Sequence, residues 1–490
     1  MAGRWPGAGG PRWSRSEATV ARILDATVTE ISEVGIAGLR VATVAAAAGV
    51  GTSSIYHFFG GRDELIAAAT ADRFDRSIGT DDSGALPVHG AAAAEQAELA
   101  QLFALLDPVP GMGRDAYAAS LLRAATGVVA SAGGSTRRQD RIVALGAAAR
   151  NPVLLARIGA SLRVRVSLGE RAFTAARSNG LLPPGLSPRA LANYSLAHQM
   201  GLVPNELMHE PVPDDEWIAV SVRVLSGVLR GDEDHADFAR AGEVLDLLVP
   251  LRRDPAEGYG DDPEGRVCAA AVRSYRRGGP NAVTVEGVRR ATGVSAGWFH
   301  RHFTDRDGLL DAIRIDLVRG HLRNDVEAIG AISRWASTPE EWTAGVLIAA
   351  NTSLSGGRDA VRWDTVEALA ASLGRPALRR ALGEIESTAI TGFADALAGA
   401  RDRGLVASAV PRRAAARFLM GYHFGLLVGE VSGLVPTPAE WRSVIGPLLR
   451  ALTPAGWERA EDALGSAPPS GSPAGGRSPR DSRTAERSGP

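Results

Sequence analysis

The chain has 490 residues, which is too long for one ordinary domain and enough for about three or four. Its apolar content of 45% and charged content of 22% are typical of a globular protein that folds in water. The formal net charge of −1 excludes a generally basic surface, so a nucleic-acid partner would have to meet a local patch. All 54 basic residues are arginine, whose side chain can bind phosphate with two parallel hydrogen bonds.

A single cysteine, Cys268, excludes a disulfide within the chain and a zinc site of the multi-cysteine kind, and it fits a reducing cytoplasm. The first residues, "MAGRWPGAGGPRW", have no apolar core and do not form a signal peptide. The apolar stretch 418–435 contains His423 and Glu430 and is interrupted by glycines, which favours a buried helix over a membrane span. We expect a cytoplasmic protein with no metal and no cofactor.

The first predicted helix follows residues 1–14, an acid-free segment with two arginines. This segment is either a flexible basic arm that reaches a neighbouring minor groove or a solvated tail, and both interpretations stay open. The helix itself has an apolar face at 3.6-residue spacing, formed by Val20, Ile23, Leu24, Val28 and Ile31. No sustained alternation of apolar and polar residues follows anywhere, so the fold class is predicted to be all-α.

Residues 40–66, "RVATVAAAAGVGTSSIYHFFGGRDELI", predict two short helices joined by a tight turn. The turn requires a residue that tolerates positive φ, which Gly49 supplies. Ala45 is small where the two helices cross, and the shared core consists of Val44, Val50 and Ile55. This spacing predicts a helix-turn-helix whose second helix can enter the DNA major groove. The exposed residues of that helix are Thr52, Ser53, Ser54, Tyr56 and His57.

The same pattern returns 244 residues later. Between 41–66 and 285–310, nine of 26 positions are identical, whereas chance would give roughly two. A second alignment, offset by 224, joins 179–203 to 403–427, so the chain is a tandem duplication. In the second copy the turn glycine is Gly293. The candidate DNA-contacting residues there are Thr284, Ser295, Ala296, Gly297, Trp298, His300, Arg301 and Arg306, and the first copy adds Arg40 and Arg62.

Arg62 and Arg306 are the predicted phosphate clamps, because each stands beside the N-terminus of the helix that follows the turn. The duplication predicts seven segments. They are a basic arm (1–14), a DNA-binding head (15–78), a helical body (79–230), a linker helix and loop (231–261), a second head (262–322), a second body (323–464) and a disordered tail (465–490).

The pattern of "AGV", "IYHFF" and "RDEL" resembles the DNA-binding domain of the tetracycline-repressor (TetR) family of bacterial transcription regulators, over about 15–78 and 262–322. The resemblance implies a three-helix DNA-binding head and an all-helical body that binds a small effector and dimerises. It further implies a repressor, not an enzyme, that an effector releases from a double-stranded DNA operator. In the family the last two body helices form a four-helix bundle, here expected at 188–208, 214–230, 412–432 and 437–452. Both halves of that bundle are present in one chain, so we expect a single-chain pseudo-dimer; further pairing of chains stays open.

Two residues of the second copy depart from the family pattern. Arg289 occupies the position of Ala45, where a buried, unpaired arginine would be costly unless its head group reaches water. His300 replaces Tyr56, and Trp298 either packs against the protein or contacts DNA. The alternative to a regulator is therefore an effector-binding or scaffold protein in which one or both heads no longer bind DNA. A helical enzyme is a third hypothesis, although the sequence has no glycine-rich phosphate loop, GxSxG or HExxH motif.

Overall fold

The computed structural model describes residues 15–78, 107–130, 134–207, 209–230, 236–252, 254–352, 359–421 and 423–465. Within these ranges all regular structure is helical and no strand occurs, which confirms the predicted fold class. The predicted arm of residues 1–14 and the predicted tail beyond Gly465 lie outside the described residues. None of the described helices combines the length and the hydropathy that a membrane-spanning segment requires.

The first head contains α1 (Arg15–Gly38), α2 (Val41–Ala48), α3 (Thr52–Phe59) and the start of α4 (Arg62–Ile78). Helix α2 ends at Gly49, whose left-handed backbone (φ 66°, ψ 39°) is the conformation that the sequence predicted for this turn. Buried side chains from all four helices meet beneath the turn, among them Ile23, Val44, Ile55 and Leu65. The helix-turn-helix therefore rests on a small apolar core of its own.

The second head repeats this arrangement with α13 (Pro263–Gly278), α14 (Val285–Thr292), α15 (Ala296–Phe303) and the start of α16 (Arg306–Trp335). Gly293 makes the same left-handed turn (φ 74°). All four helices here begin with a side-chain cap, in which Asp262, Thr284, Ser295 and Asp305 each accept a hydrogen bond from a backbone N–H. In the first head Arg40 and Gly51, which precede α2 and α3, provide no such cap. Because each cap contributes about 1 kcal/mol, the two short helices of the second head are better anchored at their N-termini.

The remaining helices form two bodies and the segment that joins them. In the first body they are α6 (Arg114–Ala130), α7 (Gly134–Ala148), α8 (Pro152–Ser178), α9 (Pro188–Met200), α10 (Val203–Leu207) and α11 (Asp214–Arg230). The joining segment contains α12 (Ala241–Leu248) and the 3-10 turns η1 (Val249–Arg252) and η2 (Pro255–Gly258), and α12 packs on α16 and α17. The second body contains the rest of α16, with α17 (Pro339–Thr352), α18 (Asp359–Ser372), α19 (Pro376–Asp402), α20 (Arg412–Met420), α21 (His423–Ser432), α22 (Pro438–Arg450) and α23 (Pro454–Gly465).

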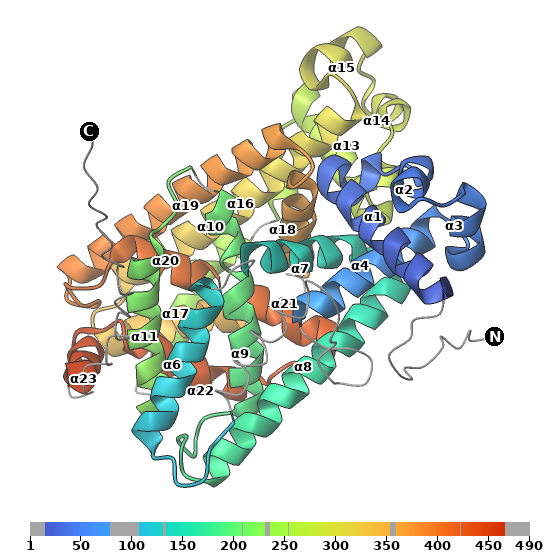
Figure 1. Ribbon diagram of the computed structural model, residues 1–490. Helices are drawn as coiled ribbons and strands as arrows, with labels where there is room; N and C mark the ends of the chain where they lie inside the picture. Colours follow the sequence, from blue (N-terminus) through green and yellow to red (C-terminus); the bar gives the residue numbers. More distant parts are fainter. Residues whose placement is uncertain are drawn as a thin grey trace, which may run out of the picture.

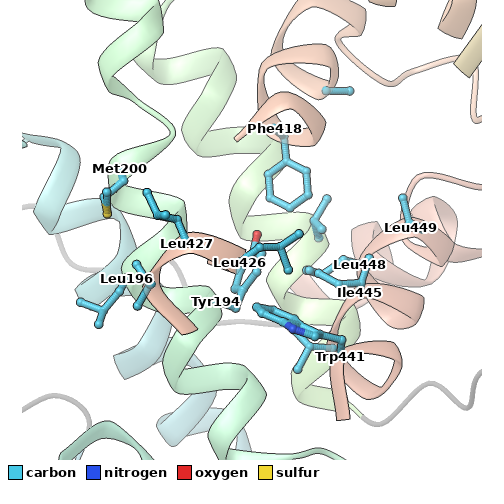
Figure 2. Packing of buried hydrophobic residues seen from close by; sticks show 14 of the residues in the cluster. Tyr194, Leu196, Met200, Phe418, Leu426, Leu427, Trp441, Ile445, Leu448 and Leu449 are labelled. Atoms are coloured by element: carbon cyan, nitrogen blue, oxygen red, sulfur yellow. The ribbon is translucent and has the colours of Figure 1, made fainter. Parts of the chain in front are cut away.

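The two bodies pack directly against each other. Helix α9 contacts α21 and α22, and α11 contacts α20 and α22. Figure 2 shows the contact, in which Tyr194 and Met200 of the first copy lie among Phe418, Leu427 and Trp441 of the second. One hydrophobic core thus runs through both bodies, and the bundle closes within one polypeptide as a single-chain pseudo-dimer.

Equivalent residues of the two copies make equivalent polar contacts across this interface. The Nδ2 atom of Asn193 donates a hydrogen bond to the carbonyl of Leu434 at 3.1 Å. Arg417, which aligns with Asn193 at the offset of 224, donates to the carbonyl of Val212 at 3.2 Å. Each copy therefore uses one side chain to hold the loop before the last bundle helix of the other copy.

The prediction of unbroken helices at 188–208 and 412–432 was wrong. Helix α9 ends at Met200 and α10 begins at Val203, while α20 ends at Met420 and α21 begins at His423. The cause is a close crossing of the two copies at Gly201 and Gly421. A Cβ atom on Gly201 would lie 2.6 Å from the Cα atom of Gly421, so a side chain at this position would collide with the other copy's backbone.

The residue that follows α3 in the first head and α15 in the second distinguishes the two heads. In the first head it is Gly60, with φ 85°, and in the second it is Thr304, with φ 61° and ψ −62°. Thr304 is the only non-glycine residue with positive φ in the described part of the chain. A β-branched side chain in this region is strained by about 1–3 kcal/mol.

We predict that T304G stabilises the second head by about 1 kcal/mol or more, because glycine takes this conformation without strain. The matched variant G60T should destabilise the first head by a similar amount. Hydrogen–deuterium exchange of peptides covering 296–303 and 52–59 measures the local opening of each head. Faster exchange around α15 in T304G would contradict the assignment of strain to Thr304.

Candidate nucleic-acid interface

The recognition helix of the first head, α3, presents a polar face. Ile55 and Phe59 are buried and fix the helix to the head. Tyr56 is 53% exposed. The predicted contact residues Thr52, Ser53 and His57 are exposed, and Ser54 is half-buried.

The equivalent helix α15 is held in the same manner by the buried rings of Phe299 and Phe303. Of the predicted contact residues, Ala296, Gly297, His300 and Arg301 are exposed, as are the two capping residues Thr284 and Ser295. Trp298 is half-buried and stacks on His302, with 3.9 Å between ring centroids. Because its ring also packs on the core of the second head, Trp298 is more restricted than its counterpart Ser54.

His300 occupies the position of Tyr56 but is oriented along its own helix. Its Nδ1 atom lies 2.7 Å from the carbonyl oxygen of Thr304, so Nδ1–H donates to that oxygen and only Nε2 is left to face DNA. The tyrosine hydroxyl of the first head can donate to phosphate oxygens. The two recognition faces therefore differ in hydrogen-bonding character as well as in sequence.

Arg62 and Arg306, the predicted phosphate clamps, have an internal partner that the sequence reasoning missed. The Nε atom of Arg62 donates to the carbonyl of Leu39 at 3.2 Å, and the Nε atom of Arg306 donates to the carbonyl of Val283 at 2.8 Å. Arg306 also donates to the carbonyl of Pro280. These bonds join the start of α4 to the residue two positions before α2, and the start of α16 to the residue two positions before α14, so both arginines stabilise the head itself. The sequence shows only that the arginine recurs at the offset of 244.

Two other predicted residues have free guanidinium groups. The side chains of Arg40, just before α2, and Arg301, on α15, are exposed. Neither makes a hydrogen bond or ion pair with another described residue. Both can therefore bind phosphate oxygens without first breaking an internal contact. Arg62 and Arg306 would have to break such a contact.

Arg289 does not disrupt the second head. Its side chain is 29% exposed and its Nη1 atom lies 3.4 Å from a carboxylate oxygen of Glu286, although Nε is buried without a partner. The guanidinium thus reaches water, which is the condition under which an arginine is tolerated at this position. Gly293 keeps its left-handed turn beside it.

The heads are attached to the bodies by partly buried ion pairs. In the first head Arg73 of α4 pairs with Asp140 of α7. In the second, Arg276 of α13 pairs with Asp254 and with Asp364 of α18, the latter at 3.2 Å. Asp364 aligns with Asp140 at the offset of 224, so each copy holds its head with an equivalent carboxylate.

One contact also joins the second head to the first body. Arg150, which follows α7, donates to the carbonyl of Arg276 at 3.4 Å and pairs with Glu367 of α18 at 3.0 Å. Tyr275 of the second head donates to the same carboxylate. The second head is thereby fixed to both copies.

In Figure 1 the two heads lie at the same end of the molecule, with α3 and α15 at its outer edges in this view. Neither recognition helix is covered by a body helix. The residues described here include no group of three or more histidine, cysteine, aspartate or glutamate side chains placed to hold a metal ion. The exposed side chains of the two recognition helices include hydroxyl, imidazole and guanidinium groups, which contact DNA phosphates and base edges in protein–DNA complexes.

The comparison with known families identifies these heads. The family described as "Bacterial regulatory proteins, tetR family" matches residues 23–69 and 267–313, the regions that hold α1 to α4 and α13 to α16. No curated protein matches the chain. The chain therefore contains two DNA-binding helix-turn-helix domains of the TetR family in tandem.

Proposed function

We propose that this DNA-binding transcription regulator is a repressor that a small molecule releases from a double-stranded DNA operator. The observation that carries the proposal is the exposure of both recognition faces, on α3 and on α15, at one end of a molecule whose bodies leave them uncovered. We also propose the seven-segment division of the chain given above and a cytoplasmic location.

The two heads would dock on successive major-groove faces, about 34–36 Å apart on B-DNA. Thr52, Ser53, Ser54, Tyr56 and His57 would contact the first half-site. Ala296, Gly297, Trp298, His300 and Arg301 would contact the second. Since these sets share no residue type at any aligned position, the operator is expected to have two unlike half-sites.

Support for release by a small molecule comes from a hollow in the second body. It is lined by residues of α16, α18 and α19, among them His321 and Arg362. His321 lies 3.4 Å from the Asp364 oxygen that also pairs with Arg276 of the second head. A molecule in the hollow would touch a residue that shares a carboxylate with the head, and could favour one head position over another.

We predict that R40A and R301A each weaken binding to the operator several-fold at low salt. Each removes one phosphate contact, so the slope of log affinity against log salt should decrease by about 0.9 per substitution. Gel shifts over a range of salt concentrations with a duplex from the protein's own promoter region measure both quantities.

The matched control is R171A, which removes an exposed arginine of α8 in the first body and should change neither quantity. R62A should also lower the affinity, but it should change the slope of log affinity against log salt less than R40A or R301A does, because Arg62 holds the head together. Wild-type protein that binds no duplex at low salt would favour the alternative of a scaffold or effector-binding protein.

We predict that DNA selection from a random library by the full chain yields an asymmetric operator. Duplexes that repeat either half-site should bind at least ten times more weakly than the selected one, because a mismatched base pair costs about 1–3 kcal/mol. Recovery of a perfect palindrome would contradict the inference from α3 and α15.

We predict that one chain occupies one operator. The bundle of α9, α11, α21 and α22 is complete within the polypeptide, so a second chain is not required to bring two heads together. Native mass spectrometry of the complex at nanomolar protein gives the stoichiometry. Two chains per duplex under these conditions would show that the heads of separate molecules cooperate instead.

A further inference from the structure

We propose that the hollow in the second body binds one small molecule per chain, and that this molecule carries a protonated amine that pairs with Glu386. The inference deepens the proposed function, because it names the chemical class of the effector. It depends on the hollow's wall, on the isolation of one carboxyl group and on a difference between the two copies.

The hollow lies where the two copies meet. It encloses about 700 Å³ when the solvent at its open side is counted. The second copy contributes α16, α18, α19, α20 and α21, and the first contributes Gly201, Pro204 and Asn205 at α9 and α10. Most of the wall is apolar, with side chains such as Leu322, Ile390, Met420 and Leu427.

Glu386 of α19 is the unusual group in this wall. Its side chain is 4% exposed, and it makes no hydrogen bond or ion pair with any other residue in the described ranges. Burial raises the pKa of this carboxyl to about 8. A buried carboxyl without a partner costs stability, so a ligand that supplies the partner would bind with a charge-assisted hydrogen bond.

The other charged groups that face the hollow already have partners. Arg362 of α18 pairs with Glu430. Arg417 of α20 donates to the carbonyl of Val212 and lies 3.8 Å from Asp214.

The wall also includes two groups of α16. His321 lies beside Asp364, and Asp325 has interactions of its own. None of the groups from α16, α18 or α20 therefore neutralises Glu386, and a cation from outside the protein is the complement that the wall lacks.

The first copy has no such group. At the offset of 224 the residue equivalent to Glu386 is Leu162, which is buried in α8 at 2% exposure. Thr365, which lines the hollow, is replaced there by Arg141. An arginine and a leucine disfavour a cation, so the equivalent positions of the first copy do not repeat the proposed site.

The pairing has a definite pH dependence. Below pH 8 the free carboxyl of Glu386 is mostly protonated, and an ammonium ion pairs with it only after the proton leaves. Binding therefore releases a proton at pH 7, and amine affinity should increase from pH 6 to pH 8 by up to about tenfold per unit.

The test uses a matched pair of probes, 2-phenylethylamine and 2-phenylethanol, which differ mainly in the ammonium group. Calorimetric titration of the full chain without DNA should show the amine binding at least tenfold more tightly than the alcohol, with one site per chain. Repeating the titration at pH 7 in two buffers of different ionisation enthalpy counts the released proton.

In E386Q the preference for the amine should disappear while the alcohol still binds, which shows that the hollow remains intact. E386L, which copies Leu162 of the first body, should behave in the same way. The matched control E384Q removes an exposed carboxylate two residues away on α19 and should keep the wild-type preference.

Failure of both probes to bind, equal affinity for amine and alcohol, or an unchanged preference in E386Q would each overturn the proposal. None of these results concerns DNA, and a gel shift without any amine tests the DNA-binding proposal separately. A chain that binds its operator but ignores the amine would retain the proposed function and lose only this inference.

Discussion

The contact between the two bodies is the constraint on which the rest of the molecule depends. Helices α9 and α11 bury apolar side chains against α20, α21 and α22, and one continuous core includes both copies. Joining the copies in one polypeptide makes this contact intramolecular, with an effective concentration that can reach the millimolar range for a short flexible linker. The position of each head relative to the other follows from this interface.

Duplication within one chain allows the two copies to diverge, which identical subunits cannot do. Both copies retain features that folding requires. These are the turn glycines, the hydrogen bond from Arg62 or Arg306 to the backbone before α2 or α14, and the carboxylates Asp140 and Asp364. Some of the features that differ lie on an exposed face or in the wall of the hollow, where His300 replaces Tyr56 and Glu386 replaces Leu162.

The heads could be predicted from sequence because their determinants are local. A glycine at the turn, an apolar pattern and a second copy were sufficient to place α2, α3, α14 and α15. The helix breaks near Gly201 and Gly421 could not be predicted, since they arise from a crossing between segments about 220 residues apart. For the same reason the internal partners of Arg62 and Arg306 and the isolation of Glu386 emerged only when tertiary contacts were known. The exposed positions Thr52, Ser53, Arg40 and Arg301 remain predicted DNA contacts.

The completeness of the bundle within one polypeptide also bears on how such a protein behaves in a cell that makes related proteins. Subunits of a two-chain relative separate on dilution and can exchange with similar subunits, which produces mixed species with unintended targets. Here the same two heads always stay together, at any copy number and in the presence of any homologue. The pairing of two dissimilar heads is thus encoded in a single gene and does not depend on the abundance of its product.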